Sequence, residues 1–121
     1  MRPFLFALGV ALAPTSAMAA PSFPFTIPTN FCYYDGYCDT FTFTVQADGS
    51  FTTLNPQGGA FSGVWSYSQA SKIVYFEFEG LGFRGSYWGT VDRRGCFNGS
   101  MIQEGAPLRS DVGVWSGCAV P

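Results

Sequence analysis

This sequence contains no histidine and only one lysine, and charged residues make up 12% of its 121 residues. Histidine is the side chain that most often transfers protons near neutral pH, so a general base would have to come from the eight carboxylates. The serines lack the G-x-S-x-G context that marks a nucleophile. Without histidine or a C-x-x-C pair, a metal site is not expected. We therefore expect neither enzymatic activity nor a cofactor.

The first residues of the chain predict export. Residues 1–19 fit a secretory signal peptide, with Arg2 at its basic end, an apolar run over 4–13 and a small-residue cleavage site at 17–19. The mature chain would begin at Ala20 and comprise 102 residues (121 minus 19), enough for a single domain, 20–121. We expect a soluble secreted or periplasmic protein with no membrane span. A net charge of −2 argues against nucleic acid as a partner.

One short pattern recurs four times: a large residue, a glycine and another large residue at steps of two, with the fourth copy looser. The copies are Phe61-Ser-Gly63-Val-Trp65, Phe83-Arg-Gly85-Ser-Tyr87, Phe97-Asn-Gly99-Ser-Met101 and Asp111-Val-Gly113-Val-Trp115. Residues two apart share one face of a strand, so each copy predicts a strand. Glycines inside strands are typical of a strongly curved or closed sheet. Asn98-Gly99 is also compatible with a tight turn, which would interrupt the third copy.

Turn residues divide the chain into eight segments of alternating apolar residues, without helical periodicity. The predicted strands are about 25–33, 37–46, 50–56, 60–67, 72–79, 82–92, 96–103 and 110–118. We predict an all-β fold, an eight-stranded antiparallel up-and-down meander that forms a closed or nearly closed barrel. Aromatic residues, 18% of the chain, would fill its interior from positions that include Phe41, Phe43, Val45, Val74, Phe76, Phe78, Phe83, Tyr87, Phe97, Met101 and Trp115.

Glycines predict the turns, and the turns predict which residues face each other. Gly36, Gly49 and Gly95 each end a three-residue loop in the left-handed position, and the last of these places Val91 opposite Phe97. A two-residue turn at 80–81 predicts a second set of pairs. Phe78 would face Phe83, and Phe76 would face Gly85, with Gly63 on the other side of Phe76. On the outer face, Glu77 would face Arg84 and form an ion pair.

The four cysteines, an even number in an exported chain, predict two disulfides. A loop at 34–36 places Cys32 opposite Cys38, and a hairpin around Pro107 places Cys96 opposite Cys118. We favour these two pairs. A Cys32–Cys118 bond, which would join the first and last strands, remains the main alternative.

An eight-stranded meander with Gly-x-Trp motifs at 63–65 and 113–115 resembles the calycin-like barrels: lipocalins, avidins and the small periplasmic inhibitors of bacterial metalloproteases. In those families the motif usually lies in the first strand, whereas here it lies in the fourth and last predicted strands. The resemblance implies the barrel fold, and it maps no ligand-binding residue onto this chain.

Two groups of residues are candidates for binding. Tyr33, Tyr34 and Tyr37 cluster on the disulfide-braced loop, where tyrosine supplies broad contact area, unless the rings fold back over the barrel end. The second group lies on the outer face of the predicted barrel and centres on Ile73, Tyr75 and Trp88. Its full set is Val64, Ile73, Tyr75, Trp88, Ile102, Val112 and Val114. Exposed together, these residues would form an interaction surface, unless that face packs internally or a register has slipped.

These observations predict an exported, non-enzymatic interaction protein whose partner is another protein or a second copy of the chain. Two alternatives stay open: a carrier of a small apolar ligand inside the barrel, and a protease inhibitor acting through the proline-rich segment 20–25.

Asp39 and Asp111 have inward parity near strand ends and could form an acid pair, but we expect them to be solvated strand-end residues.

Overall fold

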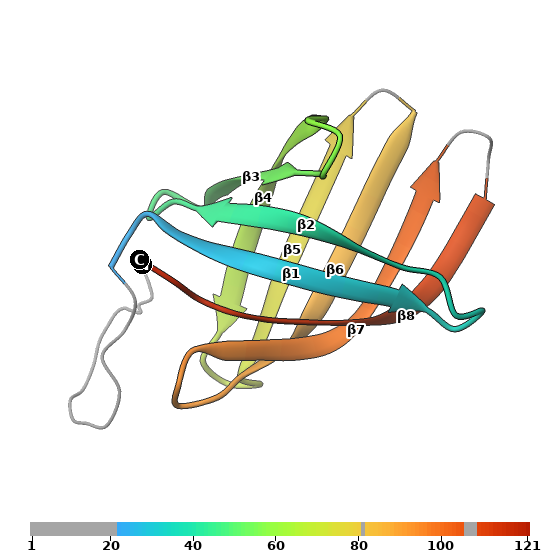
Figure 1. The fold of residues 1–121 in the computed structure, drawn as a ribbon. Helices are drawn as coiled ribbons and strands as arrows, with labels where there is room; N and C mark the ends of the chain where they lie inside the picture. The colour runs from blue at the N-terminus through green and yellow to red at the C-terminus, as the bar shows by residue number, and fades with distance from the viewer. Residues whose placement is uncertain (1–21, 81, 106–108) are drawn as a thin grey trace.

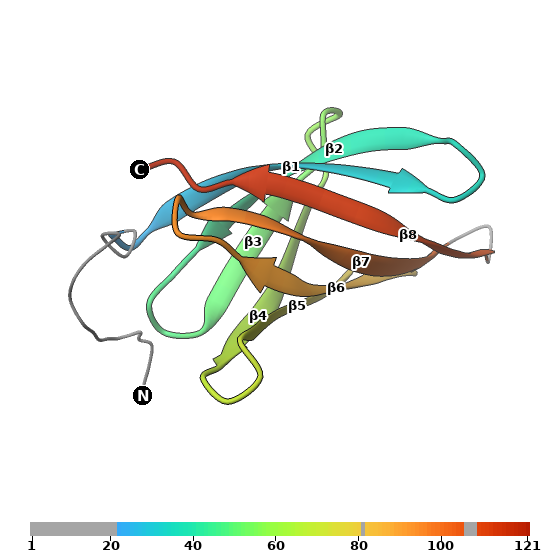
Figure 2. The ribbon, with the colours of Figure 1, turned by 90° about the horizontal axis from the view of Figure 1, so that it is seen from below.

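The computed structural model describes residues 22–80, 82–105 and 109–121, and in these it confirms the predicted eight-stranded antiparallel barrel. The strands are β1 (Phe25–Tyr33), β2 (Cys38–Val45), β3 (Ser50–Leu54), β4 (Ala60–Ser68), β5 (Ile73–Gly80), β6 (Phe83–Val91), β7 (Cys96–Gly105) and β8 (Arg109–Cys118). Figure 1 shows them following one another round the barrel, and Figure 2 shows β8 lying beside β1, the pairing that closes it. The predicted signal peptide, residues 1–19, and Pro107 lie outside the described residues.

Strict alternation along the strands separates interior from exterior. In β5, Val74, Phe76 and Phe78 are buried, while the residues between them are exposed. The buried apolar core consists of Phe25, Ile27, Phe31, Phe41, Phe43, Val45, Phe51, Val74, Phe76, Phe78, Tyr87, Phe97, Met101 and Trp115. The predicted inward residues all belong to it except Phe83, which is half-buried and packs against it. An eight-stranded barrel has just enough room for such side chains.

The three predicted glycine turns are confirmed. Gly36, Gly49 and Gly95 have φ angles of 102°, 92° and 81°, in the left-handed region that glycine adopts without steric cost. At the second turn, the Asp48 carboxylate accepts hydrogen bonds from the backbone N–H and the hydroxyl of Ser50, and these bonds lower the pKa of Asp48. These turns fix their hairpin registers because each has one glycine in the position that requires it.

The predicted pairing of Val91 with Phe97 is also confirmed. On the other side of β7, Trp115 pairs with Gly99. Gly99 therefore lies inside β7 and not in a tight turn at Asn98-Gly99. A side chain on Gly99 would collide with the backbone of the neighbouring β6 strand, so this close approach requires glycine.

The predicted register of the β5–β6 hairpin is wrong by two residues. Gly80 pairs with Phe83 and ends β5, and it is Gly82 that has the positive φ, 66°. Gly80 points inward and the ring of Phe61 occupies the place of its missing side chain, so this glycine serves packing and not the turn. As a result, the residue that pairs with both Gly63 and Gly85 is Phe78, not Phe76.

The same shift overturns the predicted ion pair between Glu77 and Arg84. Glu77 faces Ser86, and the residue opposite Arg84 on β5 is Glu79. The Arg84 guanidinium instead binds Glu104 on β7, with 2.9 Å between Nη2 and Oε1. Both side chains are well exposed, so this pair stabilises the fold by at most about 1 kcal/mol.

Both favoured disulfides are present. Cys32 bonds to Cys38 and Cys96 to Cys118, and the partners lie directly opposite each other, with Cα atoms 4.0 and 3.9 Å apart. The alternative Cys32–Cys118 bond is thereby excluded. Two disulfides are consistent with an oxidising compartment.

The residues that precede and follow the barrel strands in the chain are attached to the barrel. Thr26 and Val120 exchange two backbone hydrogen bonds of 2.9 and 2.8 Å, and the ring of Phe23 stacks on Trp65 with centroids 5.8 Å apart. The indole N–H of Trp65 donates to the carbonyl of Gln46. The chain entering β1 is therefore fastened to the barrel from Phe23 onward.

Candidate functional site

The interior of the barrel is packed with aromatic rings. Tyr87 lies at its centre and is fully buried. The rings of Phe43, Trp115, Phe78 and Phe31 surround it, with centroids 5.3, 5.5, 6.0 and 6.4 Å from its own. Such offset and edge-to-face contacts are the favoured arrangements of aromatic pairs. The interior therefore functions as a packed core.

Three polar atoms in this core have no hydrogen-bond partner in the described part of the chain: Thr53 Oγ1, Tyr87 Oη and Gln103 Oε1. The other end of the Gln103 amide donates to Tyr33 Oη at 2.8 Å. Burial, and to a smaller extent the Tyr33 phenol, raises the pKa of Tyr87 well above its ordinary value of 10.0. Tyr87 is therefore a neutral core residue and does not supply a titrating group near pH 7.

The three loop tyrosines do not form one surface. Tyr33 turns back over the barrel, where its ring contacts Phe31 and packs against the core. Tyr37 stacks on Tyr33 at 5.8 Å, and its hydroxyl donates to Asp39, which raises the pKa of Tyr37. Tyr34 and Tyr37 have 71% and 56% of their surface exposed, so these two face solvent. Of the three predicted loop residues, only Tyr33 is turned toward the core.

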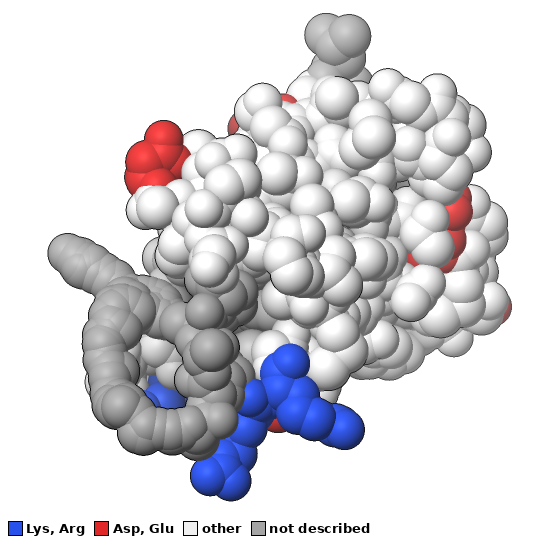
Figure 3. Space-filling model, turned by 60° about the vertical axis from the view of Figure 1, so that its left-hand side comes forward, with Lys and Arg blue, Asp and Glu red and all other residues white. Residues whose placement is uncertain are grey.

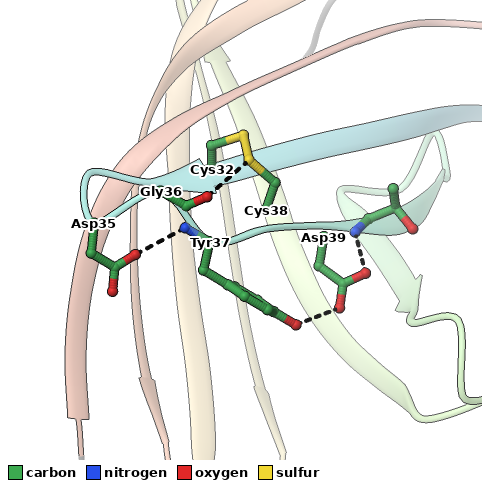
Figure 4. Close-up of a disulfide and its surroundings, with 7 residues drawn as sticks. Cys32, Asp35, Gly36, Tyr37, Cys38 and Asp39 are labelled. Atoms are coloured by element: carbon green, nitrogen blue, oxygen red, sulfur yellow. Dashed lines mark hydrogen bonds between the residues drawn. A yellow bond between two sulfur atoms is a disulfide. The ribbon is translucent and has the colours of Figure 1, made fainter.

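Figure 4 shows how the loop is held. The Cys32–Cys38 disulfide closes its base, and the Asp35 carboxylate accepts the backbone N–H of Tyr37 at 3.0 Å. Beyond it, Asp39 accepts hydrogen bonds from the Tyr37 hydroxyl and the Thr40 N–H. The loop is therefore a braced turn in which both carboxylates accept hydrogen bonds from neighbouring residues.

The outer face brings Tyr75 and Trp88 together. The two residues lie directly opposite each other on β5 and β6, and each has 36% of its surface exposed. The Tyr75 hydroxyl donates to Ser86 Oγ at 3.3 Å. Neither ring contacts another ring, and the Trp88 indole N–H has no hydrogen-bond partner among the residues that the structure describes. This pair, which we call the wall site, is the most available aromatic surface on the strands.

The predicted apolar set on this face is divided by polar residues. Trp88 is followed across the sheet by Ser100 and then by Val114, and Ser86 stands between Glu77 and Ile102. Ile73 lies beside Tyr75 on β5 and is partly buried. The remaining members, Val64, Val112 and Val114, are exposed. In register, the wall site is therefore a small aromatic surface flanked by hydroxyls, by Ile73 and by Glu77, and Ser100 separates it from Val114 on β8.

The possible acid pair is not assembled as a pair. Asp39 lies at the start of β2, with its hydrogen bonds directed to Tyr37 and Thr40. Asp111 lies on β8 opposite Gln103, and β1 stands between these two strands. Within the described ranges, histidine, cysteine, aspartate and glutamate side chains nowhere gather in a group of three that could hold a metal ion.

No glycine-rich phosphate loop is expected from the sequence, although residues 80–85 have the G-x-G-x-x-G spacing of such loops. In that motif the glycines lead from a strand into a helix. Here Gly80 ends β5, Gly82 lies in the turn and Gly85 lies inside β6, which runs antiparallel to β5. The spacing therefore belongs to a β-hairpin, and nothing about it supports a phosphate site.

Charge is distributed unevenly, which the small net charge conceals. Lys72 in the β4–β5 turn and the two arginines at 93–94 in the β6–β7 turn lie at the same end of the barrel. Figure 3 shows basic side chains gathered at this end, below a broad area without charge. Glu79, Arg84 and Glu104 form a row near the opposite end. The wall site lies between these charged ends.

Comparisons with known protein families, with curated proteins and with solved structures found no match to this chain. The closed barrel of eight antiparallel strands is compatible with the calycin-like architecture. In the described residues, no helix is long and apolar enough to cross a membrane.

Proposed function

We propose that this chain is an exported, non-enzymatic binding protein of calycin-like architecture that engages its partner through the outer wall of the barrel. Tyr75 and Trp88 form the centre of the contact surface, with Ile73 beside them and Tyr34 as an accessory contact on the disulfide-braced loop. The observation that carries the proposal is the exposed, unstacked Tyr75–Trp88 pair. Aromatic residues are enriched at recognition surfaces because they offer large contact area with few rotatable bonds.

Two features of the fold support binding by side chains on the wall. The rings within the barrel pack against each other with centroids 5.2–6.5 Å apart. This packing favours the outer wall over the interior as the binding surface. The strands form a closed barrel, so β-strand addition to an open sheet edge is not available to the described strands. The alternatives receive less support: the carrier needs interior space, and the inhibitor needs a projecting segment, whereas Phe23 stacks on Trp65.

The experiment compares the wild type with Trp88→Glu and with Leu54→Glu, a control at an exposed apolar position on β3. Each mature protein is immobilised and exposed to medium or cell-envelope extract of its source, and the retained protein and carbohydrate are both measured. We expect the wild type and the control to retain the same material and Trp88→Glu to lose it. Sedimentation over a wide concentration range tests self-association in the same set.

Two outcomes would contradict the proposal. If the wild type retained no more than Trp88→Glu and sedimented as a monomer at every concentration, the wall site would not be a binding surface. If Trp88→Glu unfolded while Leu54→Glu did not, Trp88 would be a structural residue. A charge at an exposed wall position costs little stability, so we expect a folded variant.

A further inference from the structure

We propose that the wall site binds a neutral saccharide, with a pyranose ring lying on the Tyr75–Trp88 pair and its hydroxyls bonded to the polar residues around the pair. The inference rests on the proposed function, because it names the class of partner for the same surface. Four observations carry it: the availability of the rings, the hydroxyls around them, the lack of charge and the small extent of the apolar surface.

The rings of the wall site are free to stack on a ligand. Each core aromatic ring contacts at least one other ring, but Trp88 and Tyr75 contact none in the described part of the chain, although they face each other across two strands. One face of a pyranose ring presents C–H groups whose hydrogens carry partial positive charge. The negative face of an aromatic ring attracts such hydrogens while it also removes apolar surface from water.

The residues around the pair supply the hydrogen bonds that a sugar requires. Ser66 lies opposite Tyr75, and Ser100 lies opposite Trp88. Ser86 and Thr90 flank Trp88 on its own strand, and Asn98 pairs with Thr90. Each hydroxyl or amide can both donate and accept, as sugar hydroxyls do. The indole N–H of Trp88 adds a donor without an internal partner.

The wall site matches a neutral ligand rather than a charged one. The row that runs through it contains Ser66, Tyr75, Trp88, Ser100 and Val114, and the next row contains Thr90, Asn98 and Ser116. None of these residues is charged. The nearest charged position on β5 is Glu77, a single carboxylate that would repel an anion. The charged row beyond it pairs Arg84 with Glu104, so its arginine is already used.

The extent of the apolar surface favours a sugar over a protein. A protein interface concentrates its energy in a contiguous, desolvated apolar centre. Here the aromatic pair is separated in register from Val114 by Ser100, and from Ile102 by Ser86. Two rings with hydroxyls on neighbouring strands, about 4.8 Å away, correspond in size to one or two sugar residues.

The test is the binding of mature protein to an immobilised array of neutral glycans that includes hexose and N-acetylhexosamine polymers, with polygalacturonate as the charged control. Dissociation constants for the soluble oligosaccharides that score are then measured by titration calorimetry. We expect Trp88→Ala and Tyr75→Ala each to weaken binding by about tenfold or more, because each removes one stacking surface. Trp88→Tyr should retain part of the affinity, Leu54→Ala all of it, and added salt should have little effect.

Every other result overturns the inference. Binding that survives in both alanine variants would place the sugar site elsewhere, and binding confined to polygalacturonate and lost in salt would show a charged ligand class. If no glycan bound, the assignment of a saccharide as the ligand would be wrong, while the proposed function could still stand. It would stand if the wild type retained a protein, or associated with itself, and Trp88→Glu did not. If that experiment failed as well, both proposals would fall.

Discussion

Tyr87 and Trp88 are consecutive residues of β6, and their surroundings are opposite. Tyr87 has no exposed surface and its ring contacts four others. Trp88 has 36% of its surface exposed, and among the described residues its ring contacts no other ring. The two residues are similar in size and chemistry. Their position in the alternation of the strand, and not their type, therefore decides whether each serves the core or the surface.

The comparison also separates two uses of a polar group on an aromatic ring. Inside the barrel, the Tyr87 hydroxyl has no partner in the described residues and was removed from water on folding, which is a cost. Outside, the Trp88 N–H also has no partner among the described residues, but a donor at the surface can bond to solvent. An unpaired donor thus costs stability in the core and costs little on the wall.

The largest expected effect contrasts Phe76 with Trp88. Phe76 is buried and its ring contacts Phe43, Phe51, Phe97 and Trp115, so Phe76→Ala should lower the free energy of unfolding by about 3–5 kcal/mol. Trp88→Ala should lower it by no more than about 1 kcal/mol, the range of a cross-strand pair. Denaturant titration of both variants measures the difference. Equal or reversed losses would show that Trp88 belongs to the core.

The sequence was sufficient to predict which residues face inward, because alternation and turns agree along most strands. It was not sufficient for the β5–β6 register, because Gly80 and Gly82 are both compatible with a left-handed turn. The ring of Phe61, which comes from β4, occupies the inward side of Gly80 and leaves the turn to Gly82. That contact joins residues far apart in sequence, and no local pattern contains it.

The β5–β6 register also determines which residue lies opposite Trp88 in the wall site. The predicted pairing places Ile73 opposite Trp88, whereas the actual pairing places Tyr75 there. A shift of two residues keeps every side chain on its own face, so the core was predicted correctly while the neighbours of Trp88 were not. The aromatic pair and its hydroxyl surroundings therefore required the structure. The inward turn of Tyr33 also depends on a distant residue, Gln103, whose amide donates to its hydroxyl.

The two disulfides should differ in their contribution to stability. Replacing Cys96 and Cys118 by alanine should cost about 3 kcal/mol, and replacing Cys32 and Cys38 about 2 kcal/mol, because the first pair closes the longer loop in the unfolded chain. Thermal and denaturant unfolding of the two double variants measures both values. The order would be contradicted by a larger loss at Cys32–Cys38, which would show that the braced loop helps to hold the closure between β1 and β8.

Alkaline pH should lower the free energy of unfolding through Tyr87, a residue of the interior. The pKa of Tyr87 is raised in the folded protein, whereas in the unfolded chain it is about 10, so this residue contributes its full stability below pH about 10. Above that pH the unfolded chain loses the proton first, and the free energy of unfolding falls by about 1.4 kcal/mol per pH unit. Urea titrations from neutral to alkaline pH should show a shallower decline for Tyr87→Phe. Parallel declines in the two proteins would mean that Tyr87 ionises normally in the folded state.

The smallest expected effect compares one hydroxyl inside with one outside. At neutral pH, Tyr87→Phe should raise the free energy of unfolding by about 1 kcal/mol, because it removes a buried donor without a described partner and keeps the ring. Tyr75→Phe should change it by less than about 0.5 kcal/mol, because its hydroxyl is at the surface and its 3.3 Å bond to Ser86 is weak. Both variants are measured by denaturant unfolding against the wild type. A loss of stability in Tyr87→Phe would show that an internal water or another group satisfies this hydroxyl. The core would then contain a polar network and would no longer contrast with the wall as an apolar interior.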